Sequence, residues 1–252
     1  MKKLILKPKE INIGNLILVN AQYPYIEDKE SIELIPVLPN DKAILLTAPA
    51  VRVLTSVMDK INGWECISAI SGWRSRKEQE ELYADSLRDN GKEYTEKYVA
   101  LPGHSEHETG LAIDLGLTQE NIDFICPEFP YKGICQKFRE VALTYGFIQR
   151  YPVGKEAITG IAHEPWHFRY VGAPHAQIMN DLGLTLEEYI GFLSGREYAH
   201  DPYVYVNKGI KVQISYVTAQ EGKDTIIEIN DNKPYAVSGN NINGFIITEW
   251  GV

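Results

Sequence analysis

The chain is poor in cysteine. Its 252 residues include three, Cys66, Cys126 and Cys135, and no C-x-x-C pair. An odd number at this spacing predicts neither a disulfide framework nor a thiolate zinc site. We interpret all three as buried structural thiols.

Long apolar runs and basic runs are also missing. No stretch approaches the ~20 apolar residues that a transmembrane helix needs, and Lys7, Lys9 and Glu10 interrupt the start before a signal-peptide core can form. The formal net charge is -9, whereas binding to nucleic acid or to an anionic membrane needs a basic face. We therefore expect no nucleic-acid partner and no membrane insertion, and we expect a cytoplasmic location.

What the chain does contain is an ordinary globular composition, with 44% hydrophobic and 23% charged residues.

Residues 1 to about 45 look irregular, apart from an apolar run at 16–20 that favours a strand. Helical spacing follows over 47–61, with Gly63 as a stop. After a β-rich stretch at 64–70, Ser75 and Glu78 form a capping box that opens a helix ending at Gly91. Arg74 is thus expected at a strand-to-helix junction.

The middle of the chain alternates and then turns helical again. Residues 111–117 read as a strand with Asp114 among small residues on one face. A helix to Tyr145 ends at Gly146, and β-like stretches follow at 147–151 and 166–171. Thr185 and Glu188 form a second capping box, whose helix ends near Gly195.

Beyond residue 198 the pattern changes to short strands separated by Gly, Asn and Asp turns, with no helical stretch between them. The sequence predicts an α+β core at 1–197, in which an antiparallel sheet carries the functional site and helices cover its other face. Residues 198–252 are predicted to form a small β appendage of unknown role.

Two clusters carry the chemistry. The first runs from Ser105 through His107 and Gly110 to Asp114, and the second is Glu164-Pro-Trp-His167. Together they supply two imidazoles, one carboxylate ligand and a spare carboxylate, which are the parts of a catalytic zinc site with one position left for water.

Small residues around Asp114 have a predicted use in that site. Gly110 lets the backbone turn after His107. Ala112 and Gly116 leave room beside Asp114 for an ion and its ligands.

His163 to His167 also matches H-E-x-x-H, which on a helix would make both histidines ligands. Pro165 disfavours a helix here, because it restricts Glu164, and the residues after it read as a strand. In a regular strand Glu164 and His167 would face opposite ways. We therefore expect a bend at Pro165, with His163 bordering the site rather than binding metal.

These motifs resemble a known family. Ser-x-His-x-x-Gly-x-Ala-x-Asp, followed by Glu-x-Trp-His and preceded by Ser-Gly-aromatic-Arg-Ser, is similar to the D-alanyl-D-alanine metallopeptidases. The run Glu-Pro-Trp-His-Phe-Arg-Tyr-Val-Gly resembles their VanY and VanXY branch, and the likeness covers about residues 45 to 195. Its departures are His163, where related enzymes often carry Tyr, and the β appendage.

The resemblance implies a role for each matching position. His107, Asp114 and His167 would hold one Zn²⁺ per chain, Glu164 would be the general base and acid, and Arg74 would meet substrate charge. Ser105 and Gln79 would contact or orient the substrate. That substrate would be D-Ala-D-Ala or a D-Ala-terminated peptidoglycan precursor, whose removal underlies resistance to vancomycin-type antibiotics.

Several alternatives stay open. Arg74 could simply pair with Glu78, Ser105 could be a turn former, and Gln79 could be a helix-face residue. A cell-wall endopeptidase of the phage-lysin type and a non-catalytic, hedgehog-like zinc domain share the core motifs. Retention of Glu164 together with Arg74 favours catalysis.

Overall fold

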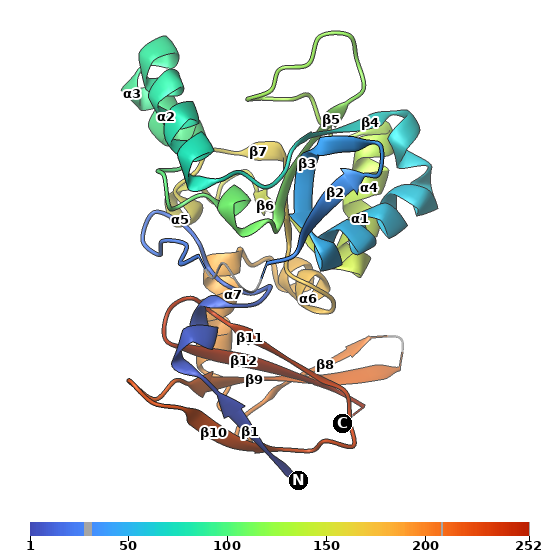
Figure 1. Cartoon of the computed structure of the whole chain (residues 1–252). Coiled ribbons are helices and arrows are strands. Elements are labelled where there is room, and N and C mark those ends of the chain that lie inside the picture. Colours follow the sequence, from blue (N-terminus) through green and yellow to red (C-terminus); the bar gives the residue numbers. More distant parts are fainter. Residues whose placement is uncertain (28–31, 208, 252) are drawn as a thin grey trace. The chain divides into compact units, whose positions relative to one another are not determined.

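The computed structural model describes residues 1–27, 32–207 and 209–251. It divides into two compact units (Figure 1), one of residues Val19–Thr185 and one of Met1–Leu18 together with Leu186–Val252. No helix in the described ranges has the length and hydropathy needed to span a bilayer.

The unit of Val19–Thr185 is built on an antiparallel four-stranded sheet. Its order is β4 (Ile67–Ser71), β5 (Ala112–Leu117), β7 (Glu164–Tyr170) and β6 (Phe147–Tyr151). Almost every residue of β5 is buried, as expected for an inner strand. The predicted fold class, an antiparallel sheet with flanking helices, is confirmed.

Two predicted helices pack on each other beside this sheet, α1 (Ala48–Ile61) and α4 (Gly133–Tyr145). The end of α1 is one residue earlier than predicted, at Asn62 in the left-handed conformation, with φ 55°. Gly146 ends α4 at φ 105°, and a Cβ there would lie 2.6 Å from the backbone of Gly172. Only glycine allows this close approach.

The predicted capping box is present at the start of α2 (Arg76–Asn90). The Ser75 hydroxyl accepts from the Glu78 backbone N–H, and the Glu78 carboxylate accepts from the Ser75 N–H. The sequence missed the short α3 (Lys92–Tyr98), which begins just after Gly91.

The region predicted to be irregular contains a hairpin of β2 (Leu34–Leu38) and β3 (Asp41–Thr47). The remaining elements of this unit are short and were not predicted from the residue pattern. Three are helical turns, η2 (Gly63–Glu65), η3 (Glu106–Thr109) and α5 (Glu156–Thr159), and the fourth is the helix α6 (His175–Leu182).

The other unit joins both ends of the chain. β1 (Lys2–Leu6) pairs with β10 (Thr225–Ile229), and a second sheet has the order β11, β12, β9, β8. Leu6 is packed in one core with Ile229 and Phe245. The bounds of the other elements are η1 Pro8–Asn12, α7 Leu186–Ser194, β8 Tyr203–Asn207, β9 Ile210–Thr218, β11 Tyr235–Gly239 and β12 Gly244–Trp250.

This division differs from the predicted boundary between residues 197 and 198. β1, η1 and α7 fall in the unit with the C-terminal strands. The pairing of β1 with a strand more than 200 residues away leaves no mark in the local sequence.

Two local predictions were wrong. The run at 16–20 is not a strand, although residues 16–19 are buried. Its backbone is bonded to scattered groups instead of a neighbouring strand: the Leu16 N–H donates to Ser238 Oγ, the Leu18 N–H donates to the Asn240 carbonyl, and Asn241 Nδ2 donates to the Leu18 carbonyl. Of the three cysteines only Cys135 is buried, whereas Cys66 is exposed.

Candidate metal centre and active site

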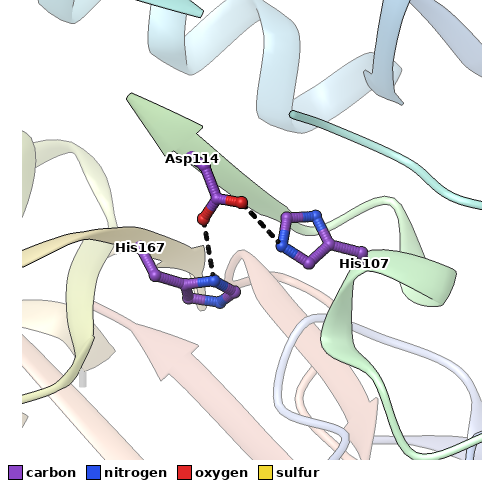
Figure 2. Close-up of side chains that lie close together, drawn as sticks. All are labelled: His107, Asp114 and His167. Atoms are coloured by element: carbon purple, nitrogen blue, oxygen red, sulfur yellow. Dashed lines mark ion pairs between the residues drawn. The ribbon is translucent and has the colours of Figure 1, made fainter. Parts of the chain in front are cut away.

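His107, Asp114 and His167 come together from three elements, η3, β5 and β7 (Figure 2). Asp114 on β5 is the register partner of His167 on β7. His107 comes from η3, just before β5. Asp114 Oδ2 lies 3.1 Å from His107 Nε2, and Asp114 Oδ1 lies 3.0 Å from His167 Nδ1. One ligand atom from each residue lies within 4.8 Å of the others, and all three residues are buried.

The turn that carries His107 fixes the orientation of its ring. Ser105 caps η3 by accepting the His107 backbone N–H, and Gly110 ends it at φ 67°. His107 Nδ1 donates to the Gly72 carbonyl at 2.7 Å. Nε2 is therefore the nitrogen left to face Asp114, and the predicted turn at Gly110 is present.

The small residue Gly116 has a different use from the one predicted. A Cβ at this position would lie 3.0 Å from Pro127 and 3.3 Å from Ile70. The space beside Gly116 is taken by these side chains and not by a metal site.

The three residues fit a metal ion. Asp114 Oδ1 is buried without a hydrogen bond among the described residues, although His167 Nδ1 is close enough in distance. Two imidazoles and one carboxylate are the ligand set of a catalytic zinc site with an open position.

Glu164 lies beside this cluster because β7 is irregular. Gln149 pairs with Phe168 and Tyr151 pairs with Glu164, so β7 takes four steps where β6 takes two. Arg139 Nη2 donates to the Pro165 carbonyl inside this bulge at 2.8 Å. The bulge returns Glu164 to the side of His167, with 3.7 Å between Glu164 Oε2 and His167 Nδ1. The bend expected at Pro165 is confirmed.

The helical H-E-x-x-H interpretation does not agree with this structure, because residues 164–170 form a strand. His163 turns away to the backbone and to a tyrosine: its Nδ1 donates to the Tyr151 carbonyl at 2.9 Å, and its Nε2 lies 3.1 Å from Tyr131 Oη. Among the described residues, the metal cluster consists of His107, Asp114 and His167 without His163.

The environment of Glu164 favours its neutral form. Burial raises the pKa of Glu164 to about 8, and the negative charges of Asp114 and Glu106 act in the same direction. A bound divalent cation would lower this pKa again, because it favours the carboxylate. Glu164 can therefore both accept and return a proton near neutral pH.

Arg74 and Gln79 form one unit at the edge of the cavity. Arg74 donates from Nη1 to Gln79 Oε1 at 2.7 Å and from Nη2 to Ser71 Oγ at 2.9 Å. Gln79 Nε2 donates to the Ala100 carbonyl at 2.7 Å. Both ends of the Gln79 amide are thus occupied, so its visible role is to orient Arg74. Glu78 is engaged with Ser75 instead of Arg74.

A cavity of about 240 Å³ joins these residues. This volume is below the roughly 300–1,000 Å³ typical of sites for drug-sized ligands, which favours a small substrate group. All seven residues predicted from the sequence to form the site line this cavity: Arg74, Gln79, Ser105, His107, Asp114, Glu164 and His167.

Comparison with known proteins places the chain. The model of the family "VanY: D-alanyl-D-alanine carboxypeptidase" matches residues 47–173. The bifunctional D-Ala-D-Ala dipeptidase and carboxypeptidase VanXYC of Enterococcus gallinarum is 40% identical over 183 residues, which are 72% of this chain and 96% of VanXYC. The chain belongs to the VanY family.

Solved VanY-family structures agree with this membership. The vancomycin-resistance D,D-dipeptidase VanXYg, solved with a D-Ala-D-Ala phosphinate analog, matches with a TM-score of 0.95 and 47% identity over 99% of this chain and 98% of that chain. A mutant of the D,D-pentapeptidase VanY from a VanB-type resistance cassette, solved with Zn(II), matches with a TM-score of 0.59 and 31% identity. That match covers 70% of this chain and 98% of the other.

Within this VanY-family site, Ser105 is both a cap and a cavity residue. It is buried, its Oγ accepts the His107 N–H at 3.3 Å, and it also lines the cavity. The turn-forming role is visible in the structure, and contact with substrate stays a prediction.

Sequence reasoning missed a buried charged group next to the ligands, made of Glu106, Arg150 and Arg169. Burial raises the pKa of Glu106, but the two guanidinium groups outweigh it and hold that pKa well below its usual range. A signal was available, because Arg150 and Arg169 stand inside predicted strands that are rich in aromatic and aliphatic residues. Arginine is rarely buried unless it is paired.

Proposed function

We propose that the chain is a zinc D,D-peptidase that hydrolyses D-alanyl-D-alanine, as the free dipeptide, as the end of a peptidoglycan precursor, or both, and so contributes to resistance to vancomycin-type antibiotics. One observation carries the proposal: a His-Asp-His cluster with a base candidate, Glu164, 3.7 Å from one ligand. The names of the VanXYC and VanXYg relatives support the choice of substrate.

The proposed ligands of a single Zn²⁺ are His107, Asp114 and His167. When bound, Zn²⁺ would act as a Lewis acid on the scissile carbonyl and lower the pKa of a water molecule. The protein's own part is to hold these three groups in place and to keep the remaining position open to the cavity.

Proton transfer falls to Glu164 in this proposal. Its carboxylate takes a proton from the attacking water, and the resulting acid gives it to the nitrogen of the departing D-alanine. Burial keeps its pKa high enough for the second step. No covalent intermediate is required.

Arg74 is proposed to bind the negative charge of the substrate, either the terminal carboxylate or the oxygen that becomes negative during attack. Gln79 and Ser71 fix two of its donors, so the planar group enters the cavity with a set direction. Ser105 is proposed to contact the substrate from the η3 side of the cavity.

The test is release of D-alanine from D-Ala-D-Ala and from a pentapeptide precursor, each with and without a chelator. We expect release that the chelator stops and that added zinc restores. Zinc binding with no release from either substrate would contradict the proposed function and favour a non-catalytic zinc domain. A cytoplasmic location also stays a prediction, which cell fractionation tests.

A further inference from the structure

A buried carboxylate lies behind the proposed metal ligand His167. The side chains of Glu106, Arg150 and Arg169 are each 0% exposed. They come from η3, β6 and β7, so three separate elements converge on one ionic group. Burying three charges is costly unless their geometry is well satisfied, and the use of this group therefore needs an explanation.

The two oxygens of Glu106 have different surroundings. Oε1 accepts from Arg150 Nε at 2.8 Å and from Arg169 Nη1 at 2.7 Å. Oε2 lies 3.6 Å from His167 Nε2. Across the described part of the chain, neither of these last two atoms has a hydrogen-bond partner. A movement of roughly half an ångström would bring them to hydrogen-bond distance.

The two proposed histidine ligands use opposite nitrogens. The Nδ1–H of His107 donates to the Gly72 carbonyl, and Nε2 of His107 faces Asp114. His167 turns Nδ1 to Asp114 and leaves Nε2 facing Glu106. A metal-bound imidazole holds its ring hydrogen on the other nitrogen, and a partner there fixes both the tautomer and the ring direction.

Glu106 is not placed to be a ligand or a base itself. Oε1 is shared by two guanidinium groups, and Oε2 lies on the Nε2 side of the His167 ring, away from Asp114. Glu164 approaches from the Nδ1 side instead. Glu106 and Glu164 therefore lie near different nitrogens of the His167 ring, Glu106 near Nε2 and Glu164 near Nδ1.

We propose that Glu106, held by Arg150 and Arg169, is a positioning residue. Its carboxylate accepts a hydrogen bond from the Nε2–H of His167, which keeps the hydrogen on Nε2 and leaves Nδ1 free to bind the zinc ion. This inference rests on the proposed function, since it assumes that His167 binds zinc. Loss of such a partner commonly weakens metal affinity about 10- to 100-fold.

The first test measures zinc affinity of the full chain by competition with a chromophoric chelator. Glu106→Gln keeps the size of the side chain but removes the charge, and we expect about 10- to 100-fold weaker binding. Glu108→Gln is the matched control. Glu108 is also buried in η3, but its carboxylate accepts from Arg76 and from the Gly103 N–H, and among the described residues it forms no ion pair with a proposed zinc ligand. We expect its zinc affinity to stay at the wild-type value.

The second test needs no variant to fold. In zinc-loaded wild-type protein, ring ¹⁵N NMR should find hydrogen on Nε2 of His167 and zinc on Nδ1. The reverse assignment, or equal zinc affinity in wild type and folded Glu106→Gln, would overturn the proposal. If the wild type binds no zinc at all, the proposed function itself fails, so the two failures are distinguishable.

Discussion

Asp114 and His167 are direct register partners across β5 and β7, with 3.0 Å between Asp114 Oδ1 and His167 Nδ1. Two of the three proposed ligands are therefore placed by backbone pairing inside a buried sheet. The third, His107, depends on a short turn and on one hydrogen bond to Gly72. The sheet thus fixes the positions of Asp114 and His167, and the η3 turn adds His107 as the third proposed ligand.

Removal of His107 should empty the site. We expect His107→Ala to lose both bound zinc and D-alanine release, because two remaining ligands hold the ion poorly. His163→Ala is the control, since His163 bonds Tyr131 and the Tyr151 carbonyl outside the cluster. Elemental analysis of purified protein measures both. Zinc loss in His163→Ala would revive the H-E-x-x-H interpretation.

Glu164→Ala should separate binding from turnover. It leaves the three proposed ligands intact but removes proton transfer, which contributes about 10²–10⁴-fold in rate. We therefore expect normal zinc content and a fall in kcat of that order. A variant with nearly normal kcat would exclude Glu164 from the mechanism.

Arg74→Lys should be poorly tolerated, because an ammonium cannot reproduce the planar fork that meets both Gln79 and Ser71. A hydrogen bond to a charged group is worth about 1.5–3 kcal/mol, so we expect kcat/KM to fall roughly 10- to 100-fold. Gln79→Ala should lower kcat/KM as well, through loss of the oriented guanidinium. Unchanged kinetics in both variants would leave Arg74 with a structural role only.

His175 should make stability sensitive to acid. Burial lowers its pKa from 6.5 to about 3 in the folded state. Below pH 6.5 the unfolded chain binds a proton that the folded protein does not, so the free energy of unfolding should fall as pH drops toward 3. The slope from this residue is at most about 1.4 kcal/mol per pH unit.

The comparison that isolates this effect is urea unfolding of wild type and His175→Gln at pH 7, 6, 5 and 4. The free energy of unfolding of the wild type, minus that of His175→Gln, should decrease as pH falls. His200→Gln is the control, because His200 is exposed. A constant difference for His175→Gln would contradict the prediction.

The division of the chain predicts which truncation keeps activity. All residues that line the cavity fall between Ile70 and His167, within the unit of Val19–Thr185. A fragment of residues 19–185 should retain zinc binding and D-alanine release. A chain ending at Ser194 should be less soluble, because β1 would lose β10, and Leu6 would lose its apolar contacts with Ile229 and Phe245. A folded, zinc-loaded but inactive fragment 19–185 would contradict this division.

Local rules predicted the elements that local residues specify. The Ser75–Glu78 capping box, the end of α4 at Gly146 and the alternation around Asp114 each leave a signal within a few positions. The hairpin of β2 and β3 was missed because Pro36 argues against a strand. It is tolerated in this two-stranded ribbon, where Pro36 is opposite Leu45.

The candidate site was predictable as far as its motifs reached. Its metal cluster follows from two short motifs. The bend at Pro165 was predicted because Glu164 and His167 would face opposite sides of a regular strand, although both were expected at the metal site. The ionic group of Glu106 was missed because its partners are 44 and 63 positions away. Such pairs become visible only when the strands are in register.

The union of β1 with β10 also sets an order of events during synthesis. Ile229, the partner of Lys2, is synthesised more than 200 residues after it. By then the whole of residues 19–185 has been translated and can already be folded. The entropic cost of closing a loop grows only with the logarithm of its length. The pairing of β1 with β10 therefore costs little more than the closing of a much shorter loop. The β1–β10 pair therefore forms only after the whole unit of residues 19–185 has been synthesised.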